Sequence, residues 1–326
     1  MKPFFDSSPI LSDSVALKQR FDADGYVYIR GLIDPGRLLG LRRQIVEICD
    51  DCHWFKPGSD PMDAISWTMP KVEGEEAYFE VYDRIQRLQD FHALAHEAPV
   101  LRLMRGLLGD TAFPHPLSIA RLVFPESQDW STPPHQDYVN NQGTPDLYAC
   151  WIPLSDCPRD LGSLAILEGS HRLGLQPVEY SLGAGHRQTS LPPEAEKLDW
   201  VASDFKLGDV IAFHSLTIHR ALANETDRMR LSVDFRYQAE GQDTTGRCLR
   251  PHFERLDWQD IYRDWDRDDL KFYWRDKQFN LVPWNAELGS LPDDHLAQAV
   301  RLQRKFNQER EQLAARYARQ NDHGQH

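Results

Sequence analysis

The sequence predicts a mainly β protein with flanking helices, and three observations support that prediction. Residues after Pro116 form short apolar runs that alternate with polar residues, which is the pattern of half-buried strands. Clusters of Gly, Pro, Asn, Asp and Ser separate these runs, as turns separate the strands of a sandwich or barrel. Residues 1–115 are mainly helical in pattern, and their helices have only the β core against which to bury apolar faces.

We therefore expect a single domain with three parts. These are an N-terminal helical region with one strand (1–115), a β core (116–238) and a C-terminal extension (239–326) that ends in a helix. The sequence contains no internal repeat and no low-complexity tract that would suggest another organisation.

The elements of the N-terminal region have recognisable boundaries. Asp34 and Pro35 supply an N-cap and a first helical residue, and Gly109 stops the last helix of the region. The expected elements are a helix over Val15–Phe21, a strand over Gly25–Leu32, a helix from Pro35 to about Ile48, a loop over Cys52–Gly74, and helices over Glu76–Leu94 and Pro99–Leu108.

The β core and the extension follow. The expected strands lie within Leu117–Phe124, His135–Tyr138, Tyr148–Leu154, Gly162–Leu167, Asp209–His219 and Arg228–Tyr237. A final helix over Asp293–Arg319 begins favourably with two acidic residues, Asp293 and Asp294. Its partial apolar stripe predicts packing on the core or across a dimer. We expect the tail, Gln320–His326, to be disordered, so that His323 and His326 are solvent residues.

Composition excludes several classes of function. The chain carries 37 basic and 50 acidic residues, a net charge of −13, which argues against nucleic-acid binding. No apolar run approaches the ~18 residues of a membrane span, and the N-terminus lacks the pattern of a signal peptide. We expect a cytoplasmic protein without disulfides. Cys49-x-x-Cys52-His53 has the spacing of a haem attachment site, but we interpret it as a helix end with buried thiols.

The segment TPPHQDYVNN suggests a metal site. In a strand, side chains two residues apart share a face, so His135 and Asp137 would converge. A third ligand could come from His214 or His219, which lie together in a later strand-like run. Two His and one carboxylate form the facial arrangement of non-haem Fe(II) oxygenases, which leaves three positions for a 2-oxo acid and O2.

An arginine further along the chain suggests how a 2-oxo acid would be held. Arg230 lies eleven residues after His219, beyond a turn over 224–227. A hairpin there would return Arg230 to the interior, where its planar guanidinium fits a carboxylate. Ser232 would share that face and could donate a second hydrogen bond.

Five motifs in order resemble the phytanoyl-CoA dioxygenase family of Fe(II)/2-oxoglutarate-dependent oxygenases. They are FDADGYVYIRGLIDPGRLLGLRRQI, PPHQDY, YACWIPLSDC, LGSLAILEGSH, and H-x4-N-x5-R at His219, Asn224 and Arg230. The resemblance implies a double-stranded β-helix, or jelly-roll (cupin-like), core. It also implies iron bound by His135, Asp137 and His219, and 2-oxoglutarate bound by Arg230. His214, five residues before His219, would lie on the opposite strand face and is expected to pack.

The sequence departs from the family at one position. The family often has a Ser two residues after the distal His, where this chain has Ala221, and we expect Ser232 to compensate. Related halogenases lack the metal-binding carboxylate, so Asp137 favours oxygen transfer or desaturation. Tyr138 and Trp151 resemble positions near the co-substrate, although aromatic residues in a β core are commonly only core.

Other polar and aromatic residues have structural alternatives. We expect Arg121 to pair with a buried Asp, although a ligand carboxylate is the other possible partner. His171 is expected to be structural. His92 and His96 have metal-capable spacing without the Glu of a zinc protease, and we interpret both as core or solvent residues. Docking of the extension or contact with substrate would each explain four tryptophans, Trp258, Trp265, Trp274 and Trp284.

The predicted function is hydroxylation of an unactivated C–H bond in a small-molecule metabolite, with release of succinate and CO2. Desaturation, epimerisation and ring formation use the same cofactors and stay open, as does a non-catalytic binding protein. Substrate specificity would come from Cys52–Gly74, Leu173–Trp200 and the extension, since long connectors carry specificity. Their Trp, Tyr and Arg content indicates a ligand with an apolar body and an acidic group. The chain is expected to be a monomer or a homodimer.

Overall fold

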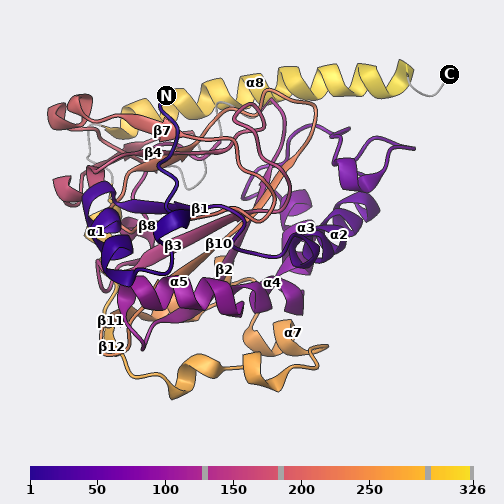
Figure 1. Ribbon diagram of the computed structural model, residues 1–326. Helices are drawn as coiled ribbons and strands as arrows, with labels where there is room; N and C mark the ends of the chain where they lie inside the picture. Colours follow the sequence, from indigo (N-terminus) through magenta and orange to yellow (C-terminus); the bar gives the residue numbers. More distant parts are fainter. Residues whose placement is uncertain (127–130, 183–186, 291–294, 324–326) are drawn as a thin grey trace.

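Two antiparallel sheets form the centre of the protein (Figure 1). The computed structural model describes residues 1–126, 131–182, 187–290 and 295–323. The larger sheet has the order β1 (Tyr26–Ile29), β8 (Val210–His214), β3 (Tyr148–Pro153), β10 (Arg230–Gln238), β2 (Phe113–Val123). The smaller sheet has the order β7 (Trp200–Ala202), β4 (Leu164–Leu167), β9 (His219–Ala221). Together they form a jelly-roll-like core that does not close into a barrel within the described residues.

Five helices lie before strand β2, and short elements followed by one long helix complete the chain. The helices are α1 (Ser14–Asp24), α2 (Pro35–Asp51), α3 (Glu76–Gln86), α4 (Gln89–Ala93) and α5 (Ala98–Leu108). The later elements are α6 (Tyr138–Asn141), the hairpin β5 (Val178–Tyr180) and β6 (Arg187–Thr189), the parallel pair β11 (Asp243–Thr245) and β12 (Asn280–Val282), α7 (Trp258–Tyr262) and α8 (His295–His323).

Strand β10 separates an apolar layer from a polar one. Its alternate residues Leu231, Val233, Phe235 and Tyr237 belong to the large core that the N-terminal helices share with the larger sheet. The polar residues that alternate with them are Arg230, Ser232, Asp234 and Arg236, and all four are buried. Because successive strand residues face opposite sides, these four polar side chains face the smaller sheet.

A second apolar core lies between the two sheets. It includes Trp151 and Phe213 from the larger sheet and Leu164 and Ile166 from the smaller one. Interiors are close-packed and resist deformation, so this core fixes the separation of the two sheets. The polar side chains of β10 therefore lie between two sheets whose separation is fixed.

The expected single helix over Glu76–Leu94 is wrong, because the chain leaves the helical conformation at Leu88 (φ −70°, ψ 115°) between α3 and α4. Two side chains donate hydrogen bonds to carbonyls near the break. Trp265 Nε1 donates to the carbonyl of Arg87 at 2.8 Å, and His92 Nε2 lies 2.9 Å from the carbonyl of Gln86. Tertiary contacts thus override the helical pattern here.

Three expected strands need correction. The run Asp209–His219 breaks at a turn, so that β8 lies in the larger sheet and β9 in the smaller one. The run His135–Tyr138 is not a strand, because His135 makes an isolated bridge and α6 follows directly. Strand β2 begins at Phe113 and includes two prolines before residue 117. Its place at the edge of the sheet explains this, since edge strands tolerate missing N–H donors.

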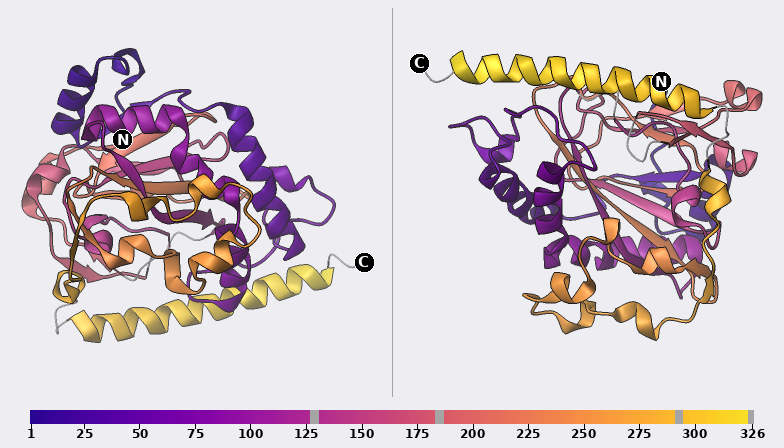
Figure 2. Two further views of the ribbon diagram at one scale, coloured as in Figure 1. Left: turned by 90° about the horizontal axis from the view of Figure 1, so that it is seen from below. Right: turned by 180° about the vertical axis from the view of Figure 1, so that it is seen from behind.

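Helix α8 runs along one side of the molecule (Figures 1 and 2). It continues to His323, so the expected disorder of Gln320–His323 is wrong. The acidic pair at 293–294 and residues 324–326 lie outside the described residues. Tyr180 in β5 donates to Gln303 at 3.0 Å, and Arg310 donates to the carbonyl of Pro70 at 2.6 Å. The helix therefore joins two segments that are distant in sequence.

Three of the four tryptophans of the extension dock it onto the protein. Trp258, Trp265 and Trp274 pack in a separate apolar cluster with Ala93 of α4. Trp284 is different, being 38% exposed. Among the residues described, no helix combines the length and the apolar character that crossing a bilayer requires.

Two buried histidines predict a loss of stability in acid. Burial lowers the pKa of both His92 and His115 to about 4, although their hydrogen bonds to the Gln86 carbonyl and the Gln238 side-chain oxygen act to raise it. The unfolded chain, with an ordinary His pKa of 6.5, binds protons first as the pH falls. The unfolding free energy should therefore decrease between about pH 6.5 and 4, by up to about 3 kcal/mol per group.

Urea unfolding at pH 7 and pH 5 checks this expectation. The variant H115N should show a smaller difference between the two pH values than the wild type. The exposed His53 provides the control, since H53N should leave the difference unchanged. An equal pH dependence in H115N and the wild type would contradict the assignment.

Candidate metal centre

His135 and His219 lie directly opposite each other across two antiparallel segments. Each backbone N–H donates to the other residue's carbonyl, at 3.0 and 3.1 Å. Directly opposed residues of an antiparallel pair place their side chains on one face, and the two ring centroids are 4.0 Å apart. The backbone bridge, rather than strand alternation, therefore brings the two imidazoles together.

Both imidazoles are oriented by a carbonyl two residues earlier in the chain. His135 Nδ1 lies 2.9 Å from the carbonyl of Pro133, and His219 Nδ1 lies 3.0 Å from that of Thr217. A carbonyl only accepts, so each Nδ1 carries the proton and each Nε2 keeps a lone pair. Metal-binding histidines are commonly oriented in this way. Burial lowers the pKa of both rings, to about 3 for His135, so they are neutral at physiological pH.

Asp137 supplies the third side chain of the group, a carboxylate. Its Oδ1 lies 3.7 Å from Nε2 of His135 and 3.9 Å from Nε2 of His219. Its Oδ2 is buried and accepts no hydrogen bond of normal geometry. Asp137 has helical dihedrals at the start of α6, so a turn, and not a strand, aims its carboxylate at the histidines.

The three side chains fit a divalent metal ion. Their ligand atoms lie within 4.8 Å of one another. In the described part of the chain, this is the cluster of His, Cys, Asp or Glu side chains that could hold a metal ion. Two neutral imidazoles and a carboxylate suit Fe(II), and a facial set of three leaves positions open for other ligands.

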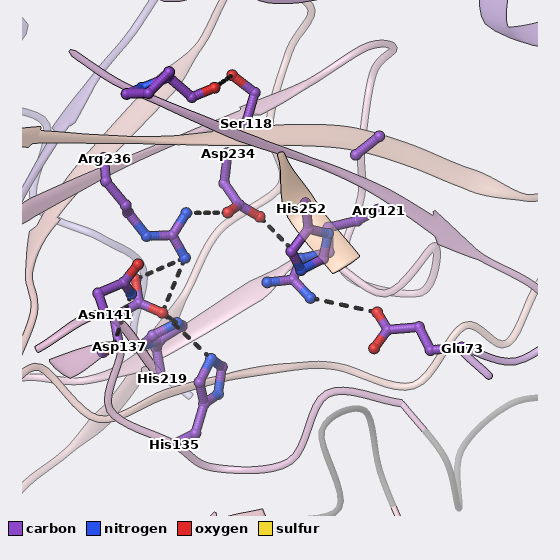
Figure 3. A network of polar contacts seen from close by, with 12 residues as sticks. Glu73, Ser118, Arg121, His135, Asp137, Asn141, His219, Asp234, Arg236 and His252 are labelled. Atoms are coloured by element: carbon purple, nitrogen blue, oxygen red, sulfur yellow. Dashed lines mark hydrogen bonds and ion pairs between the residues drawn. The ribbon is translucent and has the colours of Figure 1, made fainter. Parts of the chain in front are cut away.

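A buried network of charges extends from Asp137 (Figure 3). Arg236 Nη2 lies 3.0 and 2.9 Å from the two carboxylate oxygens of Asp137, and its Nη1 contacts Asp234. Arg121 donates to Asp234 at 2.9 Å and lies 3.8 Å from Glu73. The expected buried Asp partner of Arg121 is thus Asp234.

Sequence reasoning missed Asp234 and Arg236, although a signal was present. Both lie in a strand-like run in which polar and apolar residues alternate, on the face that also presents Arg230 and Ser232. Buried charges need partners, so four polar residues at alternate positions indicate a polar interior. Neighbouring carboxylates raise the pKa of Arg236 against the effect of burial, and the guanidinium stays charged.

Arg230 is a buried cation with no carboxylate partner among the described residues. It is 3% exposed, and its Nη1 donates to Ser232. Its guanidinium lies 5.6 Å from the ring centre of Trp151. Burial lowers its pKa to about 10, so it remains charged at neutral pH. A buried unpaired charge is costly, and an anionic ligand would relieve that cost.

Asn224 explains how Arg230 enters the interior. Its side chain donates to the carbonyl of Arg228 at 2.7 Å and accepts from Thr226. These bonds hold the turn between β9 and β10, as Asn side chains commonly do. The spacing H-x4-N-x5-R therefore has a structural cause.

Two cavities adjoin the metal-binding group. The first is lined by His135 and His219 together with Arg121, Thr132, Trp151, Leu164, Phe213, Ala221, Arg230, Asp234 and Arg236. The second contacts His135, Asp137, Thr132, Arg121 and Arg236, and continues past Glu73, Leu117, Ile119, Asn140, Asn141, Arg187, Arg247, His252 and Phe253. All three connectors expected to carry specificity contribute to the second cavity.

The remaining candidates have other surroundings. Tyr138 is absent from the lining of both cavities, and its hydroxyl donates to Gly143. His214 packs beside Tyr148, as expected, although at the end of β8 rather than within one long strand. His171 contacts the carbonyl of Asp22. His96 lies edge-on to Tyr273, away from any metal group of the described chain.

A jelly-roll-like core with a largely buried group of two His and one carboxylate defines the class of non-haem metal oxygenases. Comparison with known proteins agrees. The sequence pattern of the phytanoyl-CoA dioxygenase (PhyH) family matches residues 21–232, and the chain belongs to that family. It is accordingly an Fe(II)- and 2-oxoglutarate-dependent oxygenase.

Sequence relatives agree with this assignment, and a solved structure has a similar fold. The chain is 28% identical to a 1-deoxypentalenic acid 11-beta-hydroxylase of Streptomyces arenae over 265 residues, 76% of this chain and 89% of the relative. It is 26% identical to the enzyme of that name from Streptomyces exfoliatus, over 77% and 90% of the two chains. The fold is similar to that of SnoN, an alpha-ketoglutarate-dependent epimerase of nogalamycin biosynthesis (TM-score 0.51, 21% identity, 71% and 84% covered).

Proposed function

We propose that this oxygenase hydroxylates an unactivated C–H bond of a small-molecule metabolite, with iron bound by His135, Asp137 and His219. The observation that carries the proposal is the place of Arg230, a buried guanidinium without a carboxylate partner among the described residues. It lines the same cavity as the two histidines. A 2-oxo diacid bound there would place one carboxylate on Arg230 while its keto acid end faces the metal.

When bound, iron with 2-oxoglutarate and O2 supplies the oxidant and releases succinate and CO2. The chain's own residues control where that chemistry occurs. His135, Asp137 and His219 occupy one side of the metal position and leave the other side to the cavities. Trp151 and Phe213 form apolar walls that exclude water. Ser232 holds Arg230 in place. Ala221 lines this cavity, where the family often has a Ser.

Hydroxylation is favoured over the other reactions of these cofactors by the relatives' activity. Two relatives that match about three quarters of the chain are named as hydroxylases of 1-deoxypentalenic acid. A small organic molecule is therefore the proposed substrate class. Product analysis distinguishes the outcomes, since hydroxylation adds one oxygen atom, whereas desaturation and ring formation remove two hydrogens.

The proposed function is tested by anaerobic titration of Fe(II) into the protein with 2-oxoglutarate. We expect a visible charge-transfer absorption, and succinate formation once O2 and a substrate such as 1-deoxypentalenic acid are added. An absent absorption band would contradict the proposed ligand set, and a band without any succinate would contradict catalysis.

Replacing Arg230 by Gln is expected to raise the KM for 2-oxoglutarate about 100-fold, because a buried charge-assisted pair is lost. Binding of Fe(II) alone should change by less than about threefold, since no iron ligand is altered. The exposed Arg102 on α5 provides the matched control, and R102Q should leave both values unchanged. Equal weakening of iron and 2-oxoglutarate binding by R230Q would indicate general damage to the fold.

Several expectations stay predictions. These are the organisation of residues 1–326 as one oxygenase domain, the cytoplasmic location, the absence of nucleic-acid binding, and the monomeric or homodimeric state.

A further inference from the structure

The second cavity is unusually basic for an acidic protein. Its charged lining consists of four arginines, Arg121, Arg187, Arg236 and Arg247, and two carboxylates, Glu73 and Asp137. The whole chain has a net charge of −13. Low-dielectric walls strengthen the field of such a lining, so the cavity favours an anion although the protein as a whole repels one.

The four arginines are of two kinds. Arg236 is buried and Arg121 is partly buried. Both lie beside Asp234, and their charges are neutralised within the network that supports Asp137. Arg187 and Arg247 are exposed at the rim, and neither forms an ion pair with a carboxylate that the structure describes. Since Asp137 would be shared with the metal ion, the positive charge left over in the cavity is that of these two rim arginines.

One segment of the C-terminal extension holds both rim arginines in place. The Arg247 guanidinium lies 5.0 Å from the ring centre of Trp284. Five residues later, Gly289 leaves room for Arg187, whose Cζ would lie 3.6 Å from a Cβ at that position. Packing against an aromatic ring and a glycine orients the two side chains without neutralising them. Arg187 and Arg247 are therefore held in position, and their positive charges have no carboxylate partner among the described residues.

Part of the lining of the same cavity is apolar. Leu117 and Ile119 of β2 are 6% and 7% exposed, and Phe253 of the extension is partly buried and packs against the main apolar core. These residues line the cavity together with His135. A ligand that fits both regions has an apolar body and one anionic end.

We propose that the substrate is an apolar molecule with a carboxylate, whose carboxylate binds Arg187 and Arg247 at the rim. Its apolar body then lies along Leu117, Ile119 and Phe253, with the reacting carbon toward His135. This inference rests on the proposed function for the reaction itself. The binding site, however, consists of protein residues only, and its anion selectivity is measurable without iron or 2-oxoglutarate.

The test uses two fluorescent molecules that differ only by an anionic group, 8-anilinonaphthalene-1-sulfonate and N-phenyl-1-naphthylamine. Titration into the metal-free protein should give at least about tenfold tighter binding of the sulfonate, because each arginine adds a charge-assisted hydrogen bond. The double variant R187Q/R247Q should weaken sulfonate binding about 10–100-fold and leave binding of the uncharged amine within about twofold. R102Q should change neither.

A second variant separates the apolar part of the site from the anionic part. F253A should weaken both molecules by a similar factor, since it removes contact with the shared ring system. Equal affinities for the two molecules, or sulfonate binding that is insensitive to R187Q/R247Q, would overturn the proposal, as would the absence of sulfonate binding. The dye titrations contain no metal, so they do not depend on the iron site. An absent charge-transfer band in the Fe(II) titration would therefore contradict the proposed function and not the carboxylate site.

Discussion

Replacing Asp137 by Ala is expected to abolish succinate formation and to weaken Fe(II) binding by about 100-fold or more. Loss of groups that merely orient metal ligands commonly costs 10–100-fold in affinity, and Asp137 is itself a proposed ligand. H135A should give the same result, because both side chains belong to one group of ligand atoms within 4.8 Å. Anaerobic iron titration and succinate release measure the two effects separately.

A carboxylate remote from the cavities provides the control for this prediction. Asp110 is exposed after α5, and D110A should bind iron and form succinate as the wild type does. The fold should survive D137A, because Arg236 keeps its contact with Asp234. Unchanged iron affinity in a folded D137A protein would contradict the proposed ligand set.

Replacing Arg236 by Gln is expected to destabilise the protein by about 3–5 kcal/mol, since removing one partner of a buried ion pair leaves uncompensated charge. Arg236 is 2% exposed and contacts both Asp137 and Asp234, which are similarly buried. In R236Q, the negative charges of Asp137 and Asp234 lose the buried positive charge that both contact. Urea unfolding at constant pH measures the difference in free energy.

The control for Arg236 is an exposed ion pair. Arg267 and Asp269 form one near the surface, and R267Q should cost less than about 1 kcal/mol. Arg236 also orients Asp137, so a folded R236K variant should bind Fe(II) about 10–100-fold more weakly. If R236Q lost no more unfolding free energy than R267Q, the buried ion pairs of Arg236 would not stabilise the protein.

The sequence was informative about the site because its chemistry is concentrated in short motifs. His135, Asp137, His219 and Arg230 occupy places expected from H-x-D and H-x4-N-x5-R, and the structure brings three of them within one metal-binding group. The reason for the convergence was not predictable. Expected strand alternation placed His135 beside Asp137, whereas a single bridge and the first turn of α6 do so.

The parts that could not be predicted depend on contacts between distant segments. The break at Leu88 reflects bonds from Trp265 and His92, which local periodicity cannot show. The split between β8 and β9 follows from their membership of different sheets. Asp234 and Arg236 lie beyond the family match, which ends at residue 232. The alternation of polar residues in this strand indicated a polar interior, but the pairing of Arg236 with Asp137 and Asp234 depends on contacts that only the folded chain reveals.

Helix α8 has a consequence for how this enzyme could diversify. It holds Tyr180, which lies directly opposite Arg187 in the hairpin, and Pro70, three residues before Glu73. Arg187 and Glu73 line the second cavity from two segments that are distant in sequence, and the helix contacts both of those segments. Substitutions along α8 would thus change the shape of the second cavity and the substrates that fit it. The proposed iron ligands lie on other elements and would stay the same.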